Sequence, residues 1–133
     1  MVSREKLLRL ARQAAQHAYC PYSKFHVGAA IVADGKIFTG ANVEITSYGL
    51  TLCAERSALA AAFSSGAREV TQVAVTCIDV QPGAPLADRT PCGACRQWLA
   101  DLAPEAVIYI DGAQQEFSVA ELLPYAFGLQ KQV

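Results

Sequence analysis

Three cysteines in two short motifs have the residue type and spacing of a metal site. Cys92 and Cys95 belong to the segment Pro-Cys-Gly-Ala-Cys-Arg-Gln, and their spacing of three places both thiols on one face of a helix, where they can bind the same ion. Cys53, which opens the segment Cys-Ala-Glu-Arg, can supply a third sulfur. Three protein ligands leave the fourth tetrahedral position of a zinc ion for water, as in catalytic rather than structural sites. The sequence therefore predicts a catalytic zinc centre.

Two further residues of the Cys-Ala-Glu-Arg motif can complete the chemistry of such a centre. Glu55 lies two residues from the expected ligand Cys53, so its carboxylate can reach a water molecule at the metal and act as a general acid and base. Three thiolates and one Zn²⁺ sum to a charge of −1, which weakens the ability of the ion to acidify water. Arg56 is expected to offset this charge by donating to the cysteine sulfurs.

Each motif opens a predicted helix, and the free N–H groups and the dipole at a helix N-terminus favour thiolates there. The sequence predicts helices at 4–18, 53–64 and 91–103, with Pro91 as the first residue of the third, and a last helical turn at 121–123. It predicts strands at 25–33, 36–42, 70–80, 107–110 and 116–119. Asp34-Gly35 is a strong hairpin signal between the first two strands.

This order of elements predicts an α/β fold in one domain, residues 1–133: a three-layer α-β-α sandwich around a five-stranded mixed sheet. The gap between the last two strands is too short for a parallel crossover, which needs about a dozen residues or more. The last two strands are therefore expected to be antiparallel.

Composition restricts the possible partners and the compartment. The chain has a net charge of −1 and no run of Lys and Arg, so a nucleic-acid partner is not expected. It shows neither a signal peptide nor an apolar run of the roughly 20 residues that span a bilayer, so no membrane association is expected. Five cysteines, an odd number, favour thiols in a reducing cytoplasm over a disulfide framework. Hydrophobic residues make up 53% of the chain, which suggests apolar surface buried against further copies.

The two motifs together have the pattern Cys-x-Glu followed by Pro-Cys-x-x-Cys that characterises zinc-dependent deaminases. With this pattern the sequence resembles the cytidine deaminase family, and the resemblance extends over nearly the whole chain. It is carried by Tyr-Ser-Lys-Phe at 22–25, Val-Gly-Ala-Ala at 27–30, Gly-Ala-Asn-Val-Glu at 40–44, the motifs at 53–56 and 91–97, and Glu-Leu-Leu-Pro at 121–124.

The resemblance implies hydrolytic deamination of free cytidine and 2′-deoxycytidine to the uridine compounds, in pyrimidine salvage, with one zinc ion per subunit. It implies that Cys53, Cys92 and Cys95 bind zinc and that Glu55 is the proton shuttle. Further implied contacts are Asn42 and Glu44 with the ribose hydroxyls, Phe25 with the pyrimidine and the Ala54 backbone with the base. In the small-subunit, homotetrameric members, residues that match Tyr48 and Phe127 reach the site of a neighbouring subunit.

Four other interpretations remain open. A blasticidin-type deaminase, which acts on a cytosine nucleoside antibiotic, shares the cysteine–glutamate motif, and a substrate panel would separate the two. A polynucleotide or tRNA deaminase usually has histidine as first ligand and a helix between its last two strands. A structural zinc module would need a fourth ligand, such as Cys20 or Cys77. A thiol redox protein could use Cys92 and Cys95, but that function leaves Cys53, Glu55 and Arg56 unexplained.

Overall fold

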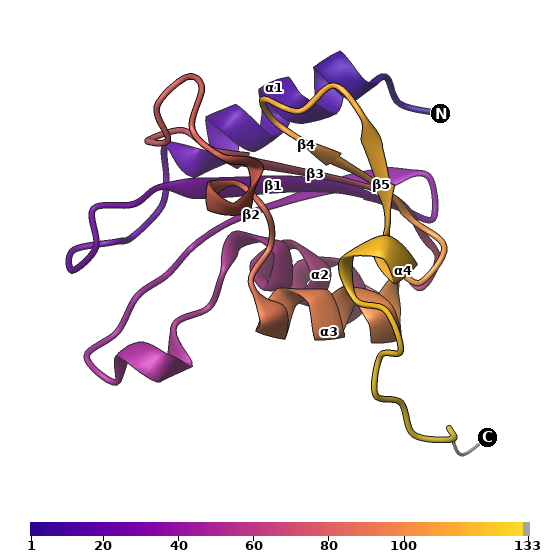
Figure 1. The fold of residues 1–133 in the computed structure, drawn as a ribbon. Helices are drawn as coiled ribbons and strands as arrows, with labels where there is room; N and C mark the ends of the chain where they lie inside the picture. Colours follow the sequence, from indigo (N-terminus) through magenta and orange to yellow (C-terminus); the bar gives the residue numbers. More distant parts are fainter. Residues whose placement is uncertain (132–133) are drawn as a thin grey trace.

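The computed structural model describes residues 1–131. Its centre is a five-stranded sheet in the order β2-β1-β3-β4-β5 (Figure 1). The strands are β1 (Val27–Ala33), β2 (Lys36–Ala41), β3 (Val70–Cys77), β4 (Val107–Ile110) and β5 (Glu116–Ser118). β3 and β4 are parallel, and the other neighbouring pairs are antiparallel. The predicted mixed sheet with antiparallel last strands is confirmed.

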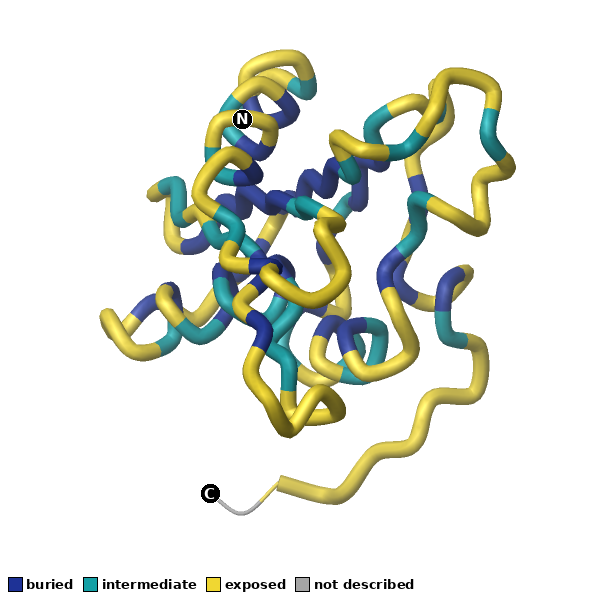
Figure 2. Tube along the Cα trace, turned by 90° about the vertical axis from the view of Figure 1, so that its left-hand side faces the viewer, coloured by how far each residue is buried: buried dark blue, intermediate teal, exposed yellow. Residues whose placement is uncertain are grey.

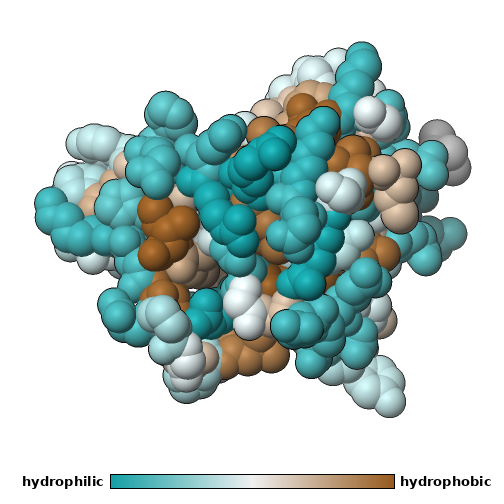
Figure 3. All heavy atoms as spheres, turned by 90° about the horizontal axis from the view of Figure 1, so that it is seen from above, coloured by the Kyte–Doolittle hydropathy of each residue, from teal (hydrophilic) through white to brown (hydrophobic). Residues whose placement is uncertain are grey.

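Helices cover both faces of this sheet. They are α1 (Arg4–Ala15), α2 (Ala54–Ser64), α3 (Gly93–Leu102) and the short α4 (Val119–Leu122), with single 3₁₀ turns η1 (Tyr48–Leu50) and η2 (Leu86–Asp88). In Figure 1, α1 lies above the sheet, whereas α2 and α3 lie side by side below it, which confirms the predicted three layers. Buried residues are concentrated between the layers (Figure 2). The outer side of the α1 layer is largely hydrophilic, with a few apolar patches (Figure 3).

Two glycines, one in β1 and one in the edge strand β2, let a helix approach the sheet closely on each face. A Cβ atom on Gly28 would lie 1.9 Å from the carbonyl oxygen of Ala11 in α1. A Cβ atom on Gly40 would lie 2.5 Å from the backbone nitrogen of Ala58 in α2. Both clashes involve helix backbone, which cannot rotate away as a side chain can, so glycine is required at both positions.

The ends of two helices differ from the prediction. α1 ends at Ala15 rather than near Ala18, because Tyr19 pairs with Val43 and the chain must leave the helix to reach it. α3 begins at Gly93, so Pro91 precedes the helix and Cys92 is its N-cap. Pro91 therefore fixes the chain just before the cap and is not the first helical residue.

Candidate active site

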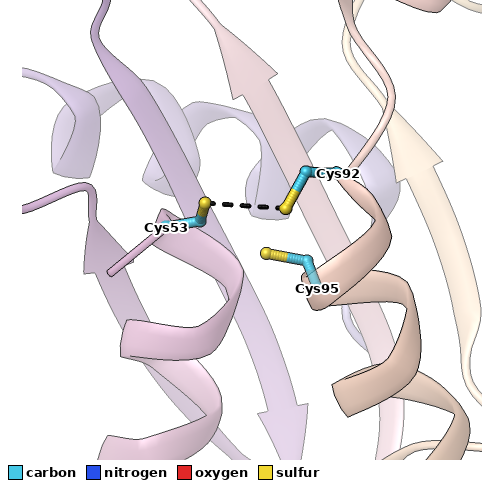
Figure 4. A group of neighbouring side chains, drawn as sticks. All are labelled: Cys53, Cys92 and Cys95. Carbon is cyan, nitrogen blue, oxygen red and sulfur yellow. Dashed lines mark hydrogen bonds between the residues drawn. The ribbon is translucent and has the colours of Figure 1, made fainter. Parts of the chain in front are cut away.

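The three predicted ligand sulfurs converge at one point below the sheet. The Sγ atoms of Cys53, Cys92 and Cys95 all lie within 4.8 Å of one another, and those of Cys53 and Cys92 are 3.7 Å apart (Figure 4). Zinc–sulfur bonds of about 2.3 Å at tetrahedral angles place two sulfurs about 3.8 Å apart. The observed spacing and the sulfur-rich donor set therefore fit a zinc ion.

Helix capping explains why these sulfurs face each other. Cys53 is the N-cap of α2 and Cys92 is the N-cap of α3, and neither sulfur accepts a capping hydrogen bond from a backbone N–H group of its own helix. Cys95 lies in the first turn of α3 and is buried. Two helix N-termini thus point at the same three thiols, and their dipoles favour negative charge there.

Arg56 contacts this cluster, as expected from the net negative charge of three thiolates and one Zn²⁺. Its Nη2 donates to the Sγ of Cys53 over 3.2 Å and to the carbonyl oxygen of Thr51 over 3.0 Å. A hydrogen bond from Cys95 and the contact with Arg56 lower the pKa of Cys53 to about 5, although burial opposes this. These contacts favour the thiolate form of Cys53, which is the form that binds metals.

Glu55 lies beside the sulfurs with its side chain in the pocket wall. It is only 3% exposed, and burial raises its pKa to about 7. A carboxyl group with such a pKa can accept and release a proton near neutral pH. A buried carboxyl group beside a possible metal site is a common arrangement for general acid–base catalysis.

A cavity of about 370 Å³ extends from the cysteines toward the surface, within the usual size range of small-ligand sites. Besides Cys53 and Cys92, its wall holds five residues expected from the sequence: Phe25, Asn42, Glu44, Tyr48 and Glu55. Three loops form the outer part, at residues 19–26, 42–52 and 78–91, and in Figure 1 they gather at one end of the sheet.

Asn42 and Glu44 are both buried and held by backbone groups. The Asn42 side chain accepts from the backbone N–H of Val27 and donates to the carbonyl oxygen of Phe25. The Glu44 carboxylate accepts from the Ser23 hydroxyl and from the backbone N–H groups of Tyr22 and Ser23. Although burial opposes it, these hydrogen bonds lower the pKa of Glu44, so this side chain is an anionic acceptor.

The other three residues expected to contact the substrate, Ala54, Tyr48 and Phe127, lie in three different environments. Ala54 is fully buried behind Cys53 and does not contribute to the cavity wall. Tyr48 lies at the cavity of its own chain, where its hydroxyl donates to Glu44 over 3.5 Å. Phe127 is 70% exposed on the C-terminal segment and is not part of this wall.

Sequence reasoning missed several wall residues, namely Ser23, Thr51, Cys77, Asp88 and Thr90. Ser23 belongs to a family motif, and its place two residues before Phe25 was the available signal. Thr51, Asp88 and Thr90 come from segments without periodicity, whereas Cys77 is the last residue of β3, in a segment predicted as a strand. Cys77 and Cys20 do not join the metal cluster found among residues 1–131, so the fourth ligand of a structural zinc module is not supplied by them.

Comparison with known proteins agrees with this site. The profile described as "Cytidine and deoxycytidylate deaminase zinc-binding region" matches residues 1–111. The chain therefore belongs to this family of zinc-binding deaminases.

Individual members resemble the chain over most of its length. A cytidine deaminase from Halalkalibacterium halodurans is 47% identical over 131 residues, which cover 95% of each chain. A cytidine deaminase from Mycobacterium tuberculosis is 46% identical over 120 residues, or 90% of this chain and 85% of that protein. The crystal structure of cytidine deaminase from Burkholderia pseudomallei superposes with a TM-score of 0.83 at 41% identity, covering 95% of this chain and all of that one.

Across residues 1–131, none of the helices has the length and apolar character needed to cross a bilayer.

Proposed function

We propose that this chain is a zinc-dependent cytidine deaminase, which hydrolyses free cytidine and 2′-deoxycytidine to uridine and 2′-deoxyuridine with release of ammonia. The observation that carries this proposal is the group of three convergent sulfurs beside a buried carboxyl group, at the inner end of a cavity that a nucleoside can enter. The family and its similar members support the choice of cytidine over the blasticidin-type substrate.

Cys53, Cys92 and Cys95 would hold the zinc ion, and Arg56 would offset part of the negative charge of the thiolates. When bound, zinc supplies Lewis acidity that makes water a stronger nucleophile at neutral pH. The hydrogen bond from Arg56 to Cys53 draws electron density from that sulfur, which strengthens this Lewis acidity.

Glu55 moves the protons of the reaction. Its carboxylate accepts a proton from the water that adds to C4 of the cytosine ring, and it transfers this proton to N3. It then accepts the second proton of the added oxygen and delivers it to the departing amino nitrogen, which leaves as ammonia. The pKa of about 7 that burial gives this group suits both directions of transfer.

The outer part of the cavity would position the nucleoside. Asn42 and Glu44 would contact the ribose hydroxyls, for which the anionic Glu44 is a strong acceptor. Phe25 would pack on the pyrimidine, and the Ala54 backbone would contact the base.

The test combines metal analysis with an ultraviolet assay of cytidine conversion. We expect the purified protein to contain about one zinc ion per chain and to deaminate cytidine. Cys53→Ser should lose both zinc and activity, whereas Cys20→Ser, a change at a buried cysteine outside the cluster, should retain them. A zinc-free native protein, or full zinc occupancy in Cys53→Ser, would contradict the proposed centre.

The assembly and compartment belong to the same proposal. A homotetramer would explain the exposed aromatic side chains of Tyr48 and Phe127, because each could reach a neighbouring site. The odd number of free cysteines supports a cytoplasmic location. Light scattering of the purified protein measures the assembly, and a monomer would contradict it.

A further inference from the structure

The charges in the cavity wall bear on which substituents of a nucleoside can enter. Three carboxyl groups line the cavity, from Glu44, Glu55 and Asp88. Among the described residues, the wall contains no lysine, arginine or histidine. Glu44 and Glu55 are almost fully buried and have roles in the proposed function. Asp88 is different, because it is exposed, and its carboxylate forms no hydrogen bond or ion pair with residues 1–131.

Asp88 lies at the outer boundary of the cavity. Together with Phe25 it also lines an adjoining open hollow of about 450 Å³, whose other wall residues come from the segment 79–84. A group that extends from the cavity into this hollow must therefore pass Phe25 and Asp88. With the amino group of the base at the cysteines, the sugar of a nucleoside lies toward this outer end.

The cations near this boundary are already bound to other groups. The Arg89 guanidinium donates to the backbone carbonyl oxygens of Gln81 and Asp111. The Nδ1 atom of His26 lies 2.8 Å from the Asp79 carboxylate. Lys24 lines a separate hollow, beside Ala18 and Pro21. Gln81 and Asp79 belong to the wall of the hollow, but Arg89, His26 and Lys24 themselves line neither the cavity nor the hollow.

We propose that Asp88 is a specificity-determining residue that excludes 5′-phosphorylated nucleosides from this site. The inference rests on the proposed function. A nucleoside monophosphate carries about two negative charges at neutral pH, and the Asp88 carboxylate repels them where no cation compensates. The uncharged 5′-hydroxyl of cytidine or deoxycytidine meets no such repulsion. This distinction matters in a family whose description includes both a nucleoside and a nucleotide, deoxycytidylate.

The test compares kcat/KM for deoxycytidine and deoxycytidylate in four proteins: the natural chain, Asp88→Asn, Asp88→Lys and the control Glu105→Gln. Glu105 is an exposed acid between α3 and β4 that does not line the cavity, so this control removes the same charge elsewhere. We expect the natural chain to prefer deoxycytidine strongly. Removing the charge in Asp88→Asn should raise the relative kcat/KM for deoxycytidylate roughly tenfold, mainly through KM, and Asp88→Lys should raise it further. Glu105→Gln should leave the ratio unchanged.

Each other outcome has a distinct meaning. If the natural chain deaminates deoxycytidine but both Asp88 variants keep its substrate ratio, the role of Asp88 is overturned while the proposed function stands. The same holds if the natural chain turns over deoxycytidylate as well as deoxycytidine, or if Glu105→Gln shifts the ratio as much as Asp88→Asn. If the natural chain turns over neither compound, the proposed function fails and the role of Asp88 fails with it.

Discussion

The two faces of the sheet use the same packing device but carry different chemistry. Gly28 admits the backbone of α1 on one face, and Gly40 admits the backbone of α2 on the other. The α1 face is filled by an apolar cluster that includes Leu7 and Ala74. The α2 face holds the buried Glu55 and the thiols at the helix N-termini as well as its apolar core.

This difference indicates a division between stability and function. Burying a charge is costly unless partners compensate, so the α2 face gives up stability to keep Glu55 in place. The α1 face buries no charged side chain, its buried Gln72 and Thr76 are hydrogen-bonded, and it contributes mainly packing. Changes on the α2 face should therefore alter activity most, and changes on the α1 face should alter stability most.

The largest effect is expected for Glu55→Gln. The amide keeps the shape of the side chain but cannot carry the protons, so turnover should fall by about two to four orders of magnitude. Zinc content should remain, because no ligand changes. The melting temperature should stay equal or rise, since a neutral amide is cheaper to bury than a charge. Steady-state kinetics, metal analysis and calorimetry measure these three quantities.

Two results would count against this assignment. Normal turnover in Glu55→Gln would remove Glu55 from the reaction. A large drop in melting temperature would show that the α2 face depends on this carboxyl group for its stability, and the division between the faces would then be wrong.

Replacing each of the two glycines by alanine, in two separate variants, tests the division between stability and function directly. Both Gly28→Ala and Gly40→Ala should lower the free energy of unfolding by about 2–3 kcal/mol, because each new methyl group meets helix backbone. Gly40→Ala displaces α2, which carries Cys53 and Glu55 at its start, so it should also lower zinc occupancy and turnover. Gly28→Ala displaces α1 and should keep both in the folded protein.

Urea denaturation followed by tryptophan fluorescence measures the stability of each variant, and zinc and activity are measured well below the melting temperature. Because each glycine variant is the control for the other, overall loss of folding affects both. If Gly28→Ala loses zinc and turnover as severely as Gly40→Ala, the two faces are coupled and the comparison fails.

The parts of this design that could be predicted from the sequence are the local ones. The spacing of Cys92 and Cys95 within one helical turn sufficed by itself to place these two sulfurs together. Cys53 lies 39 residues from Cys92 and was assigned to the same ion through the zinc-deaminase pattern. The short segment between β4 and β5 determined their antiparallel pairing. For the Cys92–Cys95 pair and for the β4–β5 pair, a few neighbouring residues in the sequence restrict the local geometry strongly.

The parts that were missed depend on contacts between distant segments. The Ser23 hydroxyl holds Glu44 across 21 residues, and no spacing rule indicates such a bond. Asp88 reaches the cavity from a long loop without periodicity. The early end of α1 follows from the pairing of Tyr19 with Val43, a tertiary contact that overrides the helical pattern beyond Ala15.

The smallest effect is expected at the edge of the α1 face, where Asp111 joins this helix to the sheet. Arg12 donates twice to its carboxylate, at 2.7 and 2.8 Å, and Thr76 donates from β3. The hydrogen bonds from Arg12 lower the pKa of Asp111 below its usual value. The pair is partly exposed, so Asp111→Asn should lower the free energy of unfolding by only about 0.5–1 kcal/mol near neutral pH.

The lowered pKa of Asp111 determines how its contribution to stability changes with pH. Because the pKa of Asp111 is lower in the folded chain than its unfolded value of about 3.9, the contribution is complete well above that pH and is lost as the pH falls through the folded value. The stability difference between the natural chain and Asp111→Asn, measured by urea denaturation, should thus shrink on acidification, while Glu105→Gln shows no such change. A difference that persists unchanged at low pH would mean that Asp111 acts by shape and not by charge, and that the α1 face owes nothing to this ion pair.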